Sequence, residues 1–396
     1  PSISVRVALG PRVQHNSCVS CSKSRPSKSL SSKKPPQISG AMLWVDKHRP
    51  HSLDKFVHAN GDIAQHLKRL VADGDCPHLL FYGVSGAGKK TLALAVLREI
   101  FGPSVEKVKV EGKIWKLEQG DRKIEVELTT ISSNYHVEMN PSDVGTKDRY
   151  VVQEVIKDMA KSRPIDAAGQ QGFKVLLLNE VDRLSKEAQH GLRRTMEKYS
   201  QACRLILICN SVSKVLDAVR SRCLPIRVSA PANTQVEELL LEVARREKLQ
   251  LPAELAGRVA LHSERNMRRA LLSLEACRVA QYPFKADQPV QGTDWEAYVA
   301  QIAGEMLAEQ SPKRLLQIRG RLYELIVNCI PAEVIMRKLV KELNRKLDAE
   351  LKHEVARWAA HYEHRLQEGQ KPIIHLEAFV AQFMAIYKKY LVSSFA

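Results

Sequence analysis

The chain has 396 residues, of which 44% are hydrophobic and 27% are charged, and its formal net charge at pH 7 is +17. Charged residues interrupt every apolar run before the roughly 18 consecutive apolar residues that a membrane-spanning helix needs, so we expect no such helix and no membrane partner. A basic excess of this size favours nucleic acid or another polyanion as a partner, although many basic proteins have no such partner.

Residues 1–41 form a leader that contains no Asp or Glu and is rich in Ser, Lys and Arg. Such a segment buries little apolar surface, and we expect it to be disordered. Met42 stands directly before the first pattern typical of folded structure, so we interpret the leader as a gene-model extension. Its composition is also typical of an organelle transit peptide, which is the alternative.

A glycine-rich segment follows the apolar strand expected at 78–82 and precedes a helix-forming stretch. Gly83, Gly86 and Gly88 allow backbone N–H groups to converge on a phosphate, and Lys89 reaches the outer phosphates of a nucleotide. Spacing and context match the Walker A motif of P-loop NTPases. We therefore predict that the chain binds ATP or ADP.

One Walker A position departs from this pattern. The residue after the lysine, usually a Ser or Thr that binds magnesium, is Lys90, and the hydroxyl comes one place later at Thr91. Neighbouring helix positions differ by about 100°, so Thr91 does not replace the missing hydroxyl from the same direction. We still assign both residues to the nucleotide site.

The second half of a nucleotide site follows the apolar strand expected at 175–179. Walker B strands usually end in Asp and then Glu, but here Asn179 replaces the metal-side carboxylate, while Glu180 keeps the position that polarises the attacking water. With two magnesium anchors missing, we expect no dedicated metal site, weakly anchored Mg²⁺ at most, and weak or absent hydrolysis. The alternative is that waters and phosphates hold the metal adequately.

With both halves of the site identified, the chain resembles the AAA+ clamp-loader ATPases, and specifically the small subunits of eukaryotic replication factor C. The segment 43–50 is similar to the family's N-terminal box, which implies that Val45 and Arg49 contact the base and the phosphates. A later strand ends at Asn210, which resembles sensor 1. This implies a hydrogen bond from Asn210 to the γ-phosphate or to the attacking water.

Two arginines extend the resemblance. Residues 220–223 match the family's Ser-Arg-Cys motif, which implies that Arg222 is an arginine finger acting in trans on a neighbouring subunit's ATP. Residues 266–270 resemble sensor 2, which implies that Arg268 meets the chain's own nucleotide. Taken alone, each arginine is more typical of a solvated surface charge. The ordered series of motifs favours the functional interpretation.

The departures at Lys90, Asn179 and 140–143 narrow the resemblance to the subfamily that includes the third human small subunit. The resemblance covers residues 42–396. It implies a nuclear heteropentamer that uses ATP to load a sliding clamp, proliferating cell nuclear antigen, onto primed DNA in replication and repair. The implied partners are the other replication factor C subunits, the clamp and primer-template DNA.

C-terminal to the leader we expect an α/β fold with additional helical domains. Residues 42–230 alternate apolar strands with helical segments, which predicts an AAA+ nucleotide-binding core with a parallel sheet covered on both faces. Within it, 113–128 has the pattern of an inserted hairpin. Residues 231–285 predict a helical lid, and 286–396 predict an all-α collar, to which the resemblance assigns oligomerisation.

A basic helix expected at 185–197 follows Walker B. In clamp loaders the corresponding surface tracks template phosphates, so we assign DNA contacts to Arg183 and Arg193, with Lys161 from the preceding loop. The alternative is that an arginine of this helix pairs with Glu197 on the same face.

Two other functions remain open. The chain could be an autonomous AAA+ DNA motor ATPase, such as a subunit of a branch-migration helicase. It could also be a scaffold subunit that binds no nucleotide, which the intact glycine-rich segment disfavours.

Overall fold

The computed structural model describes residues 42–56, 59–74, 76–119, 122–161, 173–200 and 202–395. The leader 1–41 lies outside the described residues, and residues from Leu43 onward form one compact unit. No helix in these ranges is both long and apolar enough to cross a membrane.

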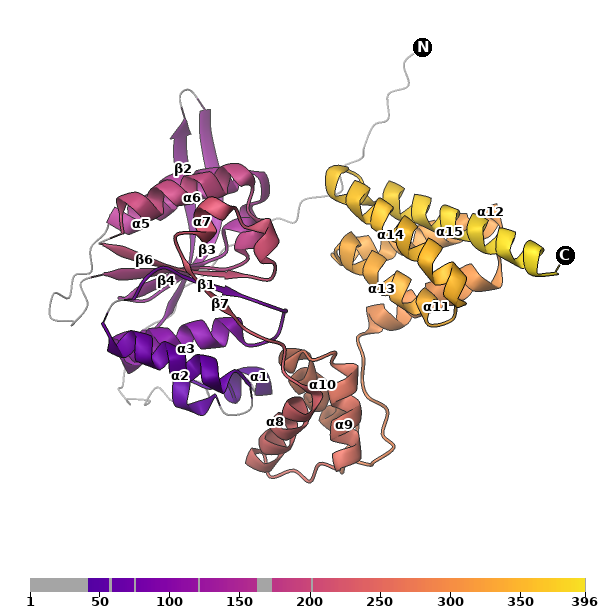
Figure 1. Ribbon diagram of the computed structural model, residues 1–396, viewed down its shortest axis with the longest axis horizontal. Coiled ribbons are helices and arrows are strands. Elements are labelled where there is room, and N and C mark those ends of the chain that lie inside the picture. Colours follow the sequence, from indigo (N-terminus) through magenta and orange to yellow (C-terminus); the bar gives the residue numbers. More distant parts are fainter. Residues whose placement is uncertain are drawn as a thin grey trace, which may run out of the picture. The chain divides into compact units, whose positions relative to one another are not determined.

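A seven-stranded sheet forms the centre of the N-terminal part, in the order β2-β3-β4-β5-β6-β1-β7 (Figure 1). Its strands are β1 (Leu79–Tyr82), β2 (Lys109–Gln119), β3 (Arg122–Ser132), β4 (His136–Met139), β5 (Lys174–Leu178), β6 (Cys203–Cys209) and β7 (Leu224–Arg227). The five strands from β4 to β7 in this order run parallel. The sheet is nevertheless mixed, because β2 and β3 pair antiparallel and extend one edge.

The antiparallel pair is the hairpin that the sequence predicts, and it is longer than the expected 113–128. Its register runs from Gln119 opposite Arg122 to Lys109 opposite Ser132. Val126 is buried while the adjacent Glu127 is exposed, as expected for a strand with one buried face. Strand β3 pairs antiparallel with β4, so the prediction of a parallel sheet is confirmed only for the five strands β4, β5, β6, β1 and β7.

Helices cover both faces of the sheet: α2 and α3 lie on one side, and α5, α6 and α7 on the other (Figure 1). The helices of this part are α1 (Trp44–Lys47), α2 (Gly61–Ala72), α3 (Lys89–Phe101), α4 (Asp148–Tyr150), α5 (Ile156–Lys161), α6 (Lys186–Lys198) and α7 (Asp217–Arg220). Shorter elements are the 3-10 helices η1 (Leu53–Lys55), η2 (Pro103–Glu106), η3 (Pro141–Lys147), η5 (Val181–Arg183) and η6 (Val212–Lys214), and the π-helix η4 (Val151–Val155).

Alternation along β1, which is covered on both faces, explains why this strand is apolar throughout. Leu79 and Phe81 of β1 pack in one hydrophobic cluster with residues of α2 and α3, whereas Leu80 packs in another with residues of α6. All three side chains are fully buried. A strand that is covered on both faces needs apolar residues at every position, which is the pattern of the sequence here.

Three helices form the lid: α8 (Asn233–Arg246), α9 (Ala253–His262) and α10 (Met267–Ala280). Their cluster also includes Trp44 of α1, which is only 3% exposed. The Trp44 backbone N–H donates to Glu275 at 3.2 Å, and the guanidinium of Arg278 lies 5.2 Å from the centre of the indole ring. The segment resembling the N-terminal box is therefore anchored to the lid.

The C-terminal part consists of α11 (Asp294–Ala308), α12 (Pro312–Val327), α13 (Ala332–Asn344), α14 (Ala349–Glu368) and α15 (Pro372–Phe395). These helices share a separate hydrophobic cluster that includes Leu322, Ile335 and Phe379. Helix α10 ends at Ala280 and helix α11 begins at Asp294, so the expected boundary at 285–286 lies between them. The helical content expected for both the lid and the collar is therefore present.

Candidate nucleotide-binding site

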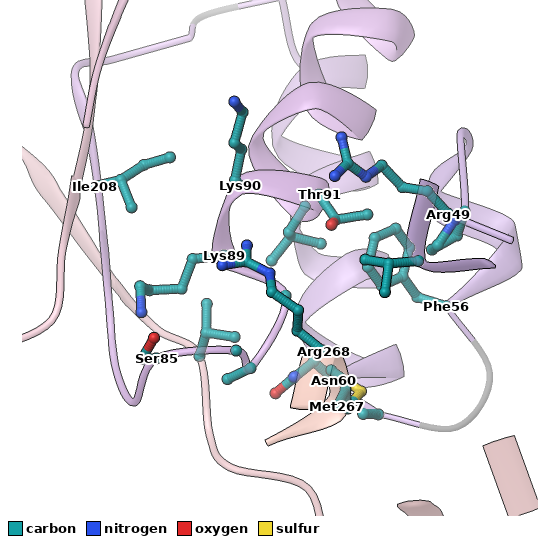
Figure 2. Close-up of a pocket in the computed structure, with 18 of the residues that line it drawn as sticks. Arg49, Phe56, Asn60, Ser85, Lys89, Lys90, Thr91, Ile208, Met267 and Arg268 are labelled. Carbon is teal, nitrogen blue, oxygen red and sulfur yellow. The ribbon is translucent and has the colours of Figure 1, made fainter. Parts of the chain in front are cut away.

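A cavity of about 370 Å³ lies between the glycine-rich loop, the segment around α1 and the start of α10 (Figure 2). Its volume is within the range of small-molecule sites. The residues predicted for the nucleotide site that line it are Val45, Arg49, Gly86, Gly88, Lys89, Lys90, Thr91, Glu180, Asn210 and Arg268. The glycine-rich loop, the segment around α1, the start of α10 and the segments that follow β5 and β6, all distant in the sequence, thus meet around one cavity.

The glycine-rich loop depends on its glycines for steric reasons. Gly83 has a φ of 146°, and a Cβ there would lie 2.1 Å from the carbonyl oxygen of Val228. Gly86 has a φ of 76°, and a Cβ would lie 1.8 Å from Oδ1 of Asn266. Gly83 does not line the cavity itself, so its contribution is to let the loop pass close to Val228, which directly follows β7.

Asn266 does not line the cavity, but it contacts the glycine-rich loop, and the sequence did not identify this contact. Its side chain caps the N-terminus of α10 by accepting a hydrogen bond from Arg269 N–H at 3.1 Å. The same side chain lies against Gly86, so the cap also brings the lid to the loop. An Asn just before a helical run is a recognisable N-cap, but its contact with a loop 180 residues earlier is not encoded locally.

The Walker A lysine folds back onto its own loop. Lys89 Nζ donates to the carbonyl oxygens of Gly83 at 2.7 Å and Val84 at 2.9 Å, and to Asn210 Oδ1 at 2.9 Å. Burial lowers the pKa of Lys89, and the positive charge of Arg268 acts in the same direction. Because an ammonium only donates, Asn210 presents its oxygen to Lys89 and keeps its NH₂ group for another acceptor.

The two positions that usually anchor magnesium meet a third residue, Glu138 of β4. The Lys90 ammonium forms an ion pair with Glu138, and Asn179 Nδ2 donates to the same Glu138 oxygen at 2.7 Å. The Glu138 side chain is only 7% exposed. The sequence did not identify Glu138 as a site residue. Its one signal was that it is a charged residue within a short, buried strand.

These residues do not fit a magnesium ion. Mg²⁺ takes oxygen ligands in near-octahedral geometry, whereas Lys90 contributes a cation and Asn179 directs its NH₂ donor at Glu138. Within the described ranges, no three His, Cys, Asp or Glu side chains are grouped so that they could hold a metal ion. The chemistry of Lys90 and Asn179 thus gives a structural reason to expect that Mg²⁺ is anchored weakly at most.

Glu180, the predicted catalytic carboxylate, lines the cavity in a strained conformation. Its φ is 51°, in the left-handed region that non-glycine residues rarely adopt. Its carboxylate pairs with Arg183, with 3.0 Å between Oε2 and Nη1. Arg183, a predicted DNA contact, is 65% exposed and remains reachable from solvent.

Two arginines approach the cavity from different elements. Arg268 extends from the start of α10 toward the loop (Figure 2), and it has no ion-pair partner among the residues that the structure describes. Arg49 pairs with Asp46 at 2.9 Å and is 29% exposed. With Lys89, these side chains make the cavity electropositive, which suits a polyphosphate.

Arg222 does not line this cavity. Its guanidinium contacts Glu197 on α6, with 2.7 Å between Nη2 and Oε1, and donates to the Ala218 carbonyl at 2.7 Å. Arg193 pairs with the same carboxylate at 3.2 Å, which is the alternative pairing considered for this helix. Lys161 ends α5, and its side chain lies outside the described residues.

Comparison with known families gives three matches. Residues 295–391 match the model for the replication factor C subunit 3 C-terminal domain, residues 238–279 match the RCF1/5-like AAA+ ATPase lid domain, and residues 59–232 match the DNA polymerase III delta subunit.

Individual relatives match along nearly their full length. The chain is 61% identical over 354 residues to replication factor C subunit 3 of Arabidopsis thaliana, covering 89% of this chain and 100% of the relative. It is 54% identical over 349 residues to replication factor C subunit 3 of Homo sapiens, covering 88% and 97%. Among solved structures, the Thermotoga maritima RuvB Holliday junction branch migration motor has a TM-score of 0.46 at 16% identity, covering 69% of this chain and 85% of that one. This similarity is too low to bear on function.

Proposed function

Because the chain belongs to the replication factor C small-subunit family, whose members are clamp-loader components, we propose that it binds ATP or ADP structurally and activates a neighbouring ATP site. In this proposal it is one subunit of a nuclear heteropentamer that opens a sliding clamp and closes it around primed DNA in replication and repair. Relatives named subunit 3 confirm the narrower subfamily prediction from the sequence.

The observation that carries the proposal is the separation of Arg222 from the chain's own cavity. Lys89, Asn210 and Arg268 line that cavity, and Arg222 does not. An arginine finger stabilises the charge that develops on a transferred phosphoryl group, so it must reach the nucleotide it serves. The position of Arg222 therefore supports action on another subunit's nucleotide.

The proposed mechanism is conformational. ATP bound between subunits favours an arrangement that is complementary to the open clamp and to DNA. DNA contacts the exposed Arg183 and Arg193, together with Lys161, and aligns the trans arginines. Hydrolysis at the neighbouring site then lowers the affinity for the clamp. In the chain's own site, Glu180 and Asn210 keep the positions of catalytic groups, but the residues at 90 and 179 do not fit the metal that hydrolysis requires.

The cavity also bears on the alternatives. The scaffold alternative, in which no nucleotide is bound, does not explain why a buried lysine and an arginine with no ion-pair partner among the described residues line one cavity, so it is disfavoured. An autonomous motor would depend on turnover at the chain's own site, which the donor set around Glu138 opposes.

The test is DNA- and clamp-stimulated ATP turnover of the reconstituted complex, with Arg222→Ala compared with Lys89→Ala in this chain. We expect a loss of about tenfold or more for Arg222→Ala, because trans arginines contribute at least that much, and little loss for Lys89→Ala. Losses in the opposite order would mean that this chain is a working ATPase. Arg246→Ala is a control, since Arg246 is an exposed arginine of α8 that pairs with Glu242 and does not line the cavity.

A further inference from the structure

The two departures from the nucleotide-binding motifs form one structural unit. Lys90 is at the start of α3, Asn179 follows β5, and both contact the same oxygen of Glu138 on β4. β4 and β5 are neighbouring parallel strands, so Glu138 lies near the carboxyl end of β5, beside the residue that follows it. The substitutions at 90 and 179 are therefore complementary to a third residue.

Glu138 explains why this unit is charged. A carboxylate buried to this degree is strongly unfavourable unless it is paired and hydrogen-bonded. Lys90 supplies the opposite charge, and Asn179 supplies a neutral donor. An aspartate at 179 would place a second carboxylate against Glu138, so the asparagine also avoids a repulsive contact.

The ammonium of Lys90 is not fully used by Glu138. It has three N–H donors, of which the ion pair occupies one, and its side chain is 35% exposed and lines the cavity. Lys89 leaves the start of the same helix in a different direction and is held by the loop (Figure 2). The cavity is thus lined by two lysines, of which Lys89 is hydrogen-bonded to loop carbonyls and Lys90 is paired with Glu138.

We infer that Lys90, held by Glu138 and Asn179, replaces the magnesium ion of an ordinary P-loop site, so that this chain binds ADP or ATP without a divalent metal. This inference rests on the proposed nucleotide binding. The magnesium ion normally bridges phosphate oxygens and the Walker B carboxylate. Here the ammonium bridges phosphate oxygens and Glu138 in the same sense. A fixed lysine carries less charge than Mg²⁺, which suits a site that retains nucleotide and does not hydrolyse it.

The test is calorimetric titration of the full-length chain with ADP and with ATP, in excess MgCl₂ and in excess EDTA. For the unmodified chain we expect dissociation constants that differ by less than about threefold between the two conditions. If binding in EDTA is about tenfold weaker or worse while binding in MgCl₂ persists, the inference is overturned and the proposed nucleotide binding stands. Failure to bind in either condition overturns both.

Variants identify the residue responsible. Lys90→Met should weaken binding at least about tenfold in both conditions, because it removes a cation and leaves Glu138 unpaired. Lys90→Arg keeps the charge and should retain binding in EDTA. The pair Lys90→Thr with Asn179→Asp restores the usual oxygen ligands, and its binding should become dependent on MgCl₂.

Lys68→Met is the matched control, because Lys68 is an exposed lysine that pairs with Asp54 and does not line the cavity. It should change neither constant. Circular dichroism of each variant establishes that it is folded. Should Lys90→Met fail to fold, the comparison of MgCl₂ with EDTA in the unmodified chain still decides the question. Retained binding of folded Lys90→Met in EDTA would overturn the inference.

Discussion

Lys89 and Asn210 are 121 residues apart in the sequence, yet Lys89 Nζ lies 2.9 Å from Asn210 Oδ1. Strands β1 and β6 are neighbours in the sheet and run parallel, so the segments that follow their carboxyl ends lie side by side. Lys89 follows β1 through the glycine-rich loop, and Asn210 follows β6 directly. The Walker A lysine is therefore in contact with the residue that resembles sensor 1.

The first prediction concerns nucleotide binding and follows from the contact between Gly86 and Asn266. Gly86→Ala places a methyl group where Asn266 lies, at a residue whose positive φ of 76° alanine disfavours, so the loop must shift. We expect ADP binding to weaken at least about tenfold, measured by titration. Gly320→Ala on α12 is the control, because nothing lies within 4 Å of the added Cβ. Unchanged binding of Gly86→Ala would show that the loop accommodates the methyl group.

The second prediction concerns the stability of the folded chain and follows from the burial of Trp44. Trp44→Ala removes a buried side chain that joins α1 to the lid, and such substitutions cost about 3–5 kcal/mol. The urea midpoint of the transition that includes the lid should fall accordingly. Val279→Ala, at a position on α10 that is 84% exposed, should change stability by no more than about 0.5 kcal/mol. Equal effects of the two changes would contradict the anchoring role of Trp44.

The third prediction concerns pH. Burial lowers the pKa of His136 below its ordinary value of 6.5, although the nearby Glu138 opposes this shift. The unfolded chain therefore binds a proton that the folded chain does not, and stability decreases as the pH falls below about 6.5. His136→Gln should reduce this decrease in urea midpoint without abolishing it, because burial also lowers the pKa of His78.

The control for the pH dependence is His353→Gln, at an exposed position on α14. Its urea midpoint should follow that of the unmodified chain from pH 7.5 to pH 5.5, a range we choose to span the ordinary histidine pKa of about 6.5. If His136→Gln also follows the unmodified chain throughout, His136 does not contribute to the pH dependence.

The fourth prediction concerns DNA. Arg183→Ala in the reconstituted complex should weaken primer-template binding and reduce the slope of log affinity against log salt by about 0.9, the value for one phosphate contact. The measurement is a salt titration of fluorescence anisotropy. Arg337→Ala removes an exposed arginine of α13 that pairs with Glu363 and serves as the control. An unaltered slope for Arg183→Ala would remove this residue from the proposed DNA surface.

The motifs could be identified from the sequence because each lies within a short segment. The glycine spacing before Lys89 and the apolar strand before Asn179 are local patterns, and both occupy the predicted strand and loop positions. The AAA+ class, the helical lid and the C-terminal helices also followed from local periodicity together with the family resemblance. The hairpin was expected as well, but its ends were not, because strand length depends on pairing with β4.

Glu138 and Asn266 could not be identified in the same way. A single carboxylate in an apolar strand has no partner that the sequence alone can name, and an N-cap asparagine has no visible link to a distant loop. Whether Arg193 would face DNA or pair with Glu197 was likewise undecided by spacing alone, and the structure contains the pair.

The sequence by itself therefore determined which local motifs this protein carries: a glycine-rich loop with Walker A spacing, a strand followed by Asn179 in place of the usual aspartate, and arginines in the order typical of the family. Only the tertiary structure decided which groups meet. Strand order and register bring Lys90, Asn179 and Glu138 together, and the capping of α10 brings the lid to Gly86. Local patterns arise from interactions between residues close in the chain, whereas the pairing of buried charges depends on packing between distant segments.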